Sequence, residues 1–177
     1  LAWLVDRPPA GPRVLRNHLR ALSRKIDGAL LTVRMIATSL RPAPLDDLGL
    51  AAAVEWQARR FQATSGVRVR MDVSVQDQSL DPSLSTAVFR ILQEALTNVA
   101  RHAYASRVEI RLVDEPGGLR LEVIDDGRGI TEGERDDLGS LGLLGMRERA
   151  RSFAGELEVK PLPGGGTKVG NTVGVGV

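Results

Sequence analysis

The most regular pattern of apolar positions lies in the middle of the chain and predicts a long helix ending near Ala103. Apolar residues recur there at intervals of three and four, the spacing of one buried helical face. This face consists of Val88, Ile91, Leu92, Ala95, Leu96, Val99 and Ala103. Asp81 and Pro82 precede the pattern and supply an N-cap and a first-turn proline. We therefore expect the helix to begin at Pro82.

Polar residues interrupt this helix at a second, regular interval. Arg90, Glu94, Asn98 and His102 are four residues apart and form one edge, with Arg101 beside the last of them. Carboxylate and amide oxygens suit Mg²⁺, and cationic side chains suit phosphate. The exposed face of an ordinary amphipathic helix has the same pattern, so this edge alone does not decide between the two interpretations.

A heptad pattern over residues 13–41 predicts a second kind of helix. Its apolar positions alternate steps of four and three: Leu15, Leu19, Leu22, Ile26, Ala29, Val33, Ile36 and Leu40. Such a seam needs a partner, so we expect a homodimer through a four-helix bundle, with residues 1–5 as the end of the preceding helix. The sequence RPAP at 41–44 ends the helix. We therefore expect a helical dimerisation segment at 1–41 and a second domain at 42–177.

The remaining patterns predict an α+β domain. A helix is expected from Leu48 to the glycine at Gly66, capped by Asp46 or Asp47. Its predicted core face is Leu48, Leu50, Ala52, Val54, Ala58 and Phe61, with Trp56 packed at the same face. Alternating apolar and polar residues predict strands at 67–75, 105–113 and 119–124, the last two as a hairpin, and two further strands flank the glycines at 164–166.

Composition narrows the class of protein. The chain has 177 residues, no cysteine and two histidines, which excludes disulfides and a thiolate zinc site and disfavours a multi-histidine metal site. No apolar run is long enough to span a bilayer, so we expect a cytoplasmic segment without membrane contact, whatever anchor lies upstream. Net charge is +6 over 13–41 and −6 over 114–137, but no nucleic-acid-reading motif accompanies the basic helix, and we expect no nucleic-acid binding.

Two glycine-containing segments near the predicted strands and helices suggest ligand chemistry. The sequence DDGRGI at 125–130 ends a strand with a carboxylate and follows it with two spaced glycines. The polar segment 131–140 has no core pattern and suits a lid, and LGLLGMRERA at 141–150 places glycines at the start of a helix, where free amides favour phosphate. An ordinary turn explains the first segment equally well, and no Gly-Lys-Ser/Thr motif is present.

Taken in order, four segments resemble the boxes of the GHKL superfamily of ATPases, which includes histidine kinases, gyrase, mismatch-repair proteins and heat-shock chaperones. EALTNVARHA is similar to the N box, DDGRGI to the first glycine box, LGLLGMRERA to the second and GGGT to the third. SLRPAPLDDLGLAAAVEW and GLLGMRERA further resemble sensor histidine kinases of the nitrate-sensor and DesK-like type. The resemblance implies a Bergerat-type sandwich of a mixed sheet and three helices that binds Mg-ATP.

The resemblance also implies roles for individual residues. It implies that Asn98 binds Mg²⁺, that Glu94 positions the water of that metal or Asn98 itself, and that Asp125 accepts a hydrogen bond from the adenine amino group. The other implied ligand-binding residues are Arg101 and His102 at the phosphates, Gly127, Gly129 and Ile130 at the purine, Gly142, Leu143, Leu144, Gly145 and Met146 at the lid hinge, and Thr167 as support for Asp125. Two departures are Ser140, where glycine is usual and whose side chain would stiffen the lid, and the tail GNTVGVGV, which we expect to weaken the final strand.

The implied function is a two-component sensor histidine kinase that passes a phosphoryl group to a histidine and then to a response regulator. Two alternatives stay open: an ATP-gated conformational module without kinase chemistry, and a dimerising adaptor whose nucleotide site is inactive. His18 is followed by Leu19 and Arg20, where an acidic base would be expected, so we expect the acceptor histidine upstream of Leu1 and no autophosphorylation of this segment alone.

Overall fold

The computed structural model describes residues 43–76, 80–116, 118–132 and 141–174. The helices are α3 (Ala43–Ser65), α4 (Pro82–Asn98), the π-helical turn η2 (Val99–Ala103) and α6 (Leu141–Arg151). The strands are β1 (Arg68–Ser74), β2 (Arg107–Glu115), β3 (Gly118–Asp125), β4 (Glu156–Pro161) and β5 (Thr167–Gly174). The predicted dimerisation segment at 1–41, with His18, and the lid residues 133–140 lie outside the described residues.

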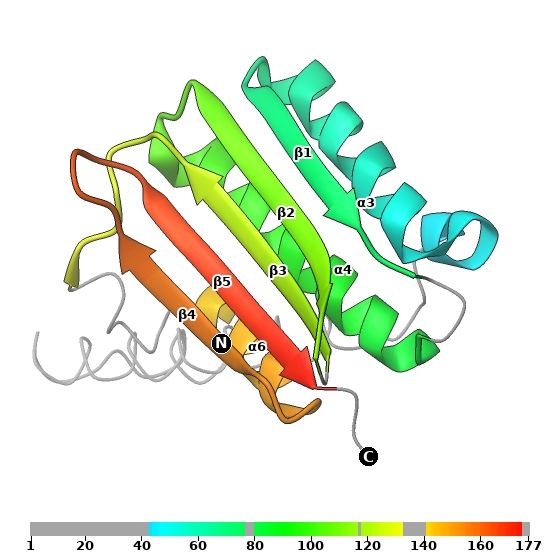
Figure 1. Ribbon diagram of the computed structural model, residues 1–177. Coiled ribbons are helices and arrows are strands. Elements are labelled where there is room, and N and C mark those ends of the chain that lie inside the picture. Colours follow the sequence, from blue (N-terminus) through cyan, green and yellow to red (C-terminus); the bar gives the residue numbers. More distant parts are fainter. Residues whose placement is uncertain (1–42, 77–79, 117, 133–140, 175–177) are drawn as a thin grey trace, which may run out of the picture. The chain divides into compact units, whose positions relative to one another are not determined.

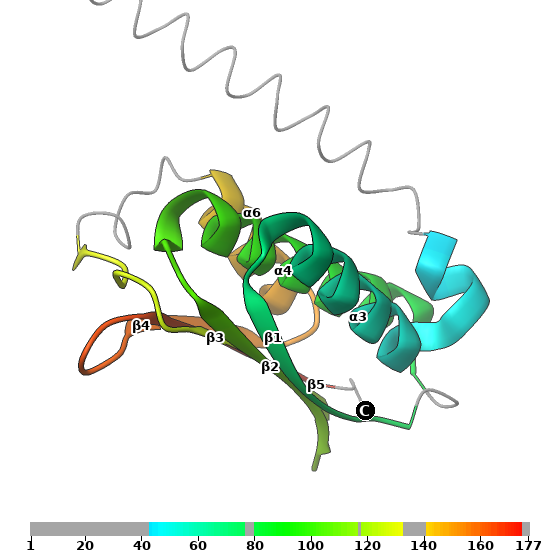
Figure 2. The same cartoon turned by 90° about the horizontal axis from the view of Figure 1, so that it is seen from above.

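The five strands form one mixed sheet in the order β1-β2-β3-β5-β4. β1 runs parallel to β2, and the other neighbouring strands are antiparallel. Figure 1 shows α4 and α6 behind the sheet and α3 beside β1, and Figure 2, seen from above, shows that all three helices lie on the same face of the sheet. This two-layer α+β arrangement is the Bergerat-type sandwich that the resemblance implied.

The core lies between the sheet and α4, as the apolar pattern predicted. All seven residues of the predicted face of this helix are buried. Asp81 caps the helix, because its Oδ1 accepts hydrogen bonds from the backbone N–H groups of Ser83 and Leu84 at 2.7 and 3.0 Å, and Pro82 follows as the first helical residue. These predictions are confirmed.

The predicted core face of α3 is only partly right. α3 begins at Ala43, ahead of the predicted caps, and Gly49 interrupts it with a φ of 77°. Leu48 precedes this kink and is 51% exposed, so it lies outside the core.

Trp56 of α3 also lies outside the core, contrary to the prediction. It is two residues from both Val54 and Ala58, which are buried, and a step of two residues turns roughly half-way around a helix. Ala52 is exposed for the same reason. Trp56 is 40% exposed, and the guanidinium carbon of Arg60 lies over its ring, 5.3 Å from the ring centroid.

The C-terminal sequence forms a strand as far as Gly174, and the expectation that it is weakened stays a prediction. β5 pairs with β3 from Lys168 to Gly174 and with β4 from Thr167 to Thr172. Asn171 faces the core and is 2% exposed.

Candidate functional site

A cavity of about 240 Å³ opens where the end of α4 and η2 meets the sheet and the start of α6. Apolar side chains form most of its wall, and a few polar groups from different elements face into it. The lining residues are Ala95, Asn98, Val99, His102, Ala103, Val123, Asp125, Arg128, Gly129, Ile130, Leu143, Val159, Thr167 and Val169. Small apolar sites with few convergent polar groups are typical of ligand-binding pockets.

Asp125 provides the buried charge of this cavity. It is the last residue of β3, where strand alternation places it on the helix-covered face with Leu121 and Val123. Burial raises the pKa of its carboxyl, and hydrogen bonds from the backbone N–H groups of Gly127 and Thr167 oppose that rise. The Gly127 bond is 2.9 Å long and ends on Oδ1. A carboxylate held in this way presents an acceptor to a ligand in an otherwise apolar wall.

The turn after Asn98 differs from the predicted helix. The α-helical hydrogen bonding stops there, Val99–Ala103 forms a π-helical turn, and Tyr104 follows in the left-handed region with a φ of 53°. The single α-helical edge predicted from Arg90 to His102 therefore ends at Asn98, and His102 lies on the π-helical turn. Asn98 and His102 both line the cavity in this arrangement, and π-helical turns occur frequently at functional sites.

Two glycines of the DDGRGI segment are required by close backbone contacts. A Cβ at Gly127 would overlap the carbonyl of Ala103 at the end of η2. Gly129 has a φ of 78° and lies against the backbone of Gly166, which itself has a φ of 93° and lies against the Asp125 carbonyl. The glycines of the first and third boxes thus pack on each other beside the cavity.

α6 contacts the cavity through Leu143, while its other predicted hinge residues do not line it. A Cβ at Gly142 would overlap the carboxylate of Glu94, so the start of α6 rests on that side chain of α4. Met146 is fully buried in the core. Leu144 and Gly145 do not belong to the lining.

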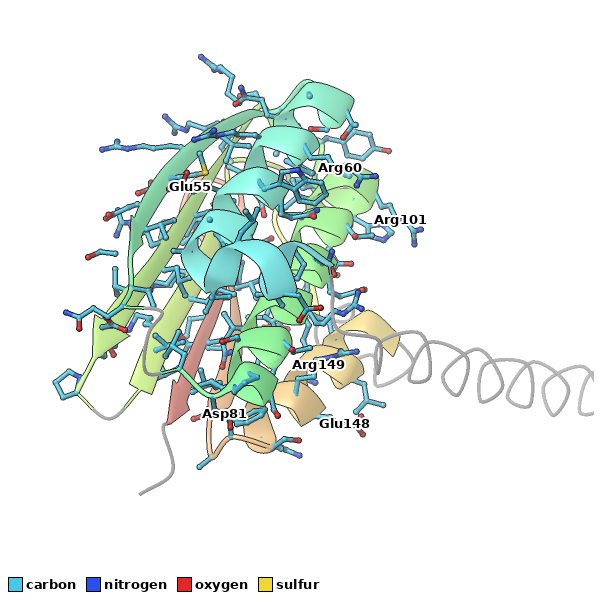
Figure 3. All side chains as sticks on the ribbon, turned by 90° about the vertical axis from the view of Figure 1, so that its right-hand side faces the viewer. Glu55, Arg60, Asp81, Arg101, Glu148 and Arg149 are labelled. Carbon is cyan, nitrogen blue, oxygen red and sulfur yellow. The ribbon has the colours of Figure 1, made fainter. Side chains whose placement is uncertain are left out.

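Arg101 and Glu94 also do not line the cavity, although the resemblance implied roles for both. Arg101 is exposed and projects outward from the helical layer (Figure 3). Glu94 is half-buried at the contact between α4 and α6.

The sequence prediction missed part of the cavity wall. Arg128, which lies between the two box glycines, had no assigned role, and it lines the cavity. The valines at 123, 159 and 169 come from β3, β4 and β5 and lie side by side, since the strand register pairs Val123 with Val169 and Val169 with Val159. In the sequence these valines appear only as apolar positions in three separate alternating strands. The strand order is needed to show that they lie together.

Within the described ranges, no group of three or more His, Asp or Glu side chains could hold a metal ion. No helix among the same residues is long and apolar enough to cross a membrane.

Residues 83–175 match the family model described as Histidine kinase-, DNA gyrase B-, and HSP90-like ATPase. The sensor histidine kinase MctS of Rhizobium johnstonii is 37% identical over 145 residues, 80% of this chain and 31% of the relative. The signal transduction histidine-protein kinase/phosphatase DegS of Brevibacillus brevis is 31% identical over 153 residues, 86% of this chain and 39% of the relative. The chain therefore spans less than half the length of these curated relatives.

Solved structures show the same fold. The histidine kinase domain of the Erythrobacter litoralis blue-light activated histidine kinase matches with a TM-score of 0.59 at 27% identity, over 71% of this chain and 61% of that one. The ATP-binding domain of PrrB from Mycobacterium tuberculosis matches with a TM-score of 0.56 at 20% identity, over 72% and 94% of the two chains. At that lower identity the likeness concerns the fold alone.

Proposed function

We propose that this chain, which belongs to the family of histidine kinase-, DNA gyrase B- and HSP90-like ATPases, is the catalytic part of a two-component sensor histidine kinase. The family implies ATP binding, and the two curated relatives are histidine kinases by name. The finer proposal is that the chain donates the γ-phosphoryl group of ATP to a histidine upstream, in a homodimer formed through residues 13–41. A response regulator then takes the phosphoryl group from that histidine.

The observation that carries this proposal is the placement of Asp125 in an apolar cavity. A purine ring fits between apolar walls, and its exocyclic amino group donates to a carboxylate. Val123 and Val169, which the strand register pairs with each other, continue the apolar wall beside Asp125, and Ile130 and Leu143 line it as well. We therefore assign the adenine ring to this part of the cavity.

Asn98 and His102 lie in the same cavity and come from the helical side. We propose that they face the phosphates, together with Arg128. Asn98 would hold Mg²⁺ through its amide oxygen, and this limited protein ligation fits an ion that usually keeps several waters and binds phosphate oxygens. Bound Mg²⁺ would neutralise charge on the phosphates.

The residues of the chain then position the phosphoryl donor and stabilise its charge. In the transfer, the bond between the γ-phosphorus and the β,γ-bridging oxygen breaks, and a bond from phosphorus to a histidine nitrogen forms. ADP leaves with the negative charge, and the imidazole proton passes to a base beside the acceptor. Positioning and electrostatic stabilisation account for most of the rate in such reactions.

Titration with a fluorescent ATP analogue in the presence of Mg²⁺ tests the adenine assignment. We expect the wild-type chain to bind with a Kd between about 1 μM and 1 mM, since one buried carboxylate gives limited anchoring. Asp125→Asn should weaken binding at least about tenfold, because the amide places a donor against the adenine amino group. Asp114→Asn is the matched control: Asp114 is an exposed aspartate on β2 that accepts the Gln76 N–H at 2.9 Å. Unchanged affinity in Asp125→Asn would refute the adenine assignment.

A longer chain that includes the upstream helix tests the kinase proposal. Incubation with γ-labelled ATP should give an acid-labile label on that helix, and His18→Gln should leave the labelling unchanged. Label that is lost in His18→Gln would overturn the proposed acceptor.

A further inference from the structure

We propose that Asp126 and Arg128 are positioning residues, which fix the π-helical turn η2 and thereby place the phosphate side of the site relative to the adenine side. This inference rests on the proposed function. In the DDGRGI segment the resemblance implied roles for Asp125, Gly127, Gly129 and Ile130, but none for Asp126 or Arg128.

Asp126 binds the segment that follows η2. Its Oδ1 accepts hydrogen bonds from the backbone N–H groups of Ser106 and Arg107, both at 2.8 Å. Its Oδ2 accepts a third bond from Ser106 Oγ at 2.8 Å. The Asp126 N–H in turn donates to the Arg107 carbonyl at 3.2 Å. Four hydrogen bonds therefore join this one residue to Ser106, in the connection after η2, and to Arg107, the first residue of β2.

Arg128 binds the end of η2 itself. Its Nε donates to the His102 carbonyl at 2.7 Å, and its backbone N–H donates to the Ala103 carbonyl at 2.8 Å. The last carbonyls of a helix lack donors within the helix, and a cation near them is favourable to the helix dipole. Because Tyr104 turns the chain into the left-handed region, the helix does not continue, and Arg128 supplies the donors that a further turn would have given.

These contacts connect the two sides of the cavity. Asp125 is held by Gly127 and Thr167, and neither of those bonds involves Asp126. Asn98 and His102, by contrast, lie at the two ends of the turn that Asp126 and Arg128 hold. Loss of the contacts at Asp126 should therefore move the helical side and leave the adenine carboxylate in place.

Electrostatics at Asp126 agree with this geometry. Hydrogen bonds from the Arg107 and Ser106 backbone and from the Ser106 hydroxyl lower the pKa of its carboxyl. The ionised carboxylate is therefore the form present at neutral pH, and it accepts all three bonds.

Asp126 is the better residue for a test, because its side chain does not line the cavity, whereas that of Arg128 does. Asp126→Ala removes the three side-chain bonds. Asp126→Asn keeps an Oδ1 acceptor for both backbone N–H groups and can donate to the Ser106 hydroxyl. Asp114→Ala is the matched control, since it removes an exposed aspartate of β2 that accepts the Gln76 N–H at 2.9 Å, away from η2.

Two ligands separate the two sides of the site: Mg-ATP probes both, and adenosine probes the adenine side alone. For Asp126→Ala we expect the Kd for Mg-ATP to rise about tenfold and the Kd for adenosine to change less than about twofold. Asp126→Asn should restore the Mg-ATP affinity to within about threefold of wild type, and Asp114→Ala should leave both affinities unchanged. Amide exchange in the nucleotide-free protein should be faster at Ser106 and Arg107 in Asp126→Ala alone.

The outcomes distinguish this inference from the function on which it rests. Wild type that binds neither ligand would remove the proposed function and the inference together. Wild-type binding with an unchanged Mg-ATP affinity in Asp126→Ala would overturn the inference alone. An equal loss of affinity for adenosine and for Mg-ATP in Asp126→Ala would also overturn the inference. The cause would then be a general disturbance of the loop and not a selective effect on the phosphate side.

Discussion

Asn171 gives a direct test of how the C-terminal strand contributes to the fold. It lies on the core face of β5, and the strand register places it between Leu121 of β3 and Leu157 of β4. Its side chain is buried, and neither Oδ1 nor Nδ2 has a hydrogen-bond partner among the residues that the structure describes. A buried polar atom without a partner costs about 1–3 kcal/mol, so Asn171 lowers the stability of this core.

We expect Asn171→Val to stabilise the protein. Removal of two unpartnered atoms should contribute about 2–6 kcal/mol, and valine also suits a strand. The larger side chain opposes this gain by about 1–3 kcal/mol if the core is already filled. When the opposing cost is subtracted from this contribution, the expected net gain in the free energy of unfolding is about 1–3 kcal/mol.

Urea unfolding measures this gain as a higher midpoint at an unchanged slope. Thr172→Val is the matched control, since Thr172 is exposed on the other face of β5 and reports the β propensity of valine alone. Asn171→Asp should destabilise the protein, because it buries a charge beside two leucines. A loss of stability in Asn171→Val would show that a bound water or an unrecognised partner satisfies the amide, and would refute the reasoning.

Three further predictions concern the cavity. Because burial raises the pKa of Asp125, its carboxylate takes up a proton at a higher pH than an exposed aspartate does. On acidification, the ATP affinity of the wild type should therefore start to fall at that higher pH. Asp125→Asn should lack this step in a titration between pH 4 and pH 8. Gly142→Ala should weaken ATP binding by about tenfold, since the added methyl displaces Glu94 or the start of α6, and Glu94→Ala in the same chain should relieve the clash and recover part of the loss in a double-mutant cycle. Asn98→Ala should reduce ATP affinity more with Mg²⁺ than with EDTA, and equal losses under both conditions would argue against metal ligation by Asn98.

The sequence predicted the elements best where one regular pattern determines the packing. The face of α4 was correct in every residue, since a run of helical spacing with Asp81 and Pro82 ahead of it leaves one register. In α3 the predicted face failed for two reasons. Leu48 lies before the kink at Gly49, which the helical period does not reveal. Ala52 and Trp56 lie two residues from buried positions, so a strict helical period would have excluded both from the core face.

Some residues of the cavity wall were predictable from the sequence, but the shape of the cavity was not. Asp125 stood out as an acid at the end of a strand, and Asn98 stood out as one of four regularly spaced polar residues on a helix with an apolar face. The π-helical turn did not, because the bonds that fix its end come from Arg128, in a segment more than twenty residues further along the chain. The three valines of the wall likewise meet only through the strand order.

Gly127 shows why the two sides of the cavity should be considered together. The resemblance implies that this glycine lets a purine approach, yet a Cβ there would already overlap the Ala103 carbonyl without any ligand. The same carbonyl accepts the Arg128 N–H, so η2 and the DDGRGI loop are in contact at a place where no side chain fits between them. A glycine at this position is therefore required by the packing of the protein itself. The close contact between η2 and the DDGRGI loop that Gly127 permits also keeps Asn98 and His102 near Asp125, so all three line one small cavity. A ligand in this cavity can therefore contact all three side chains.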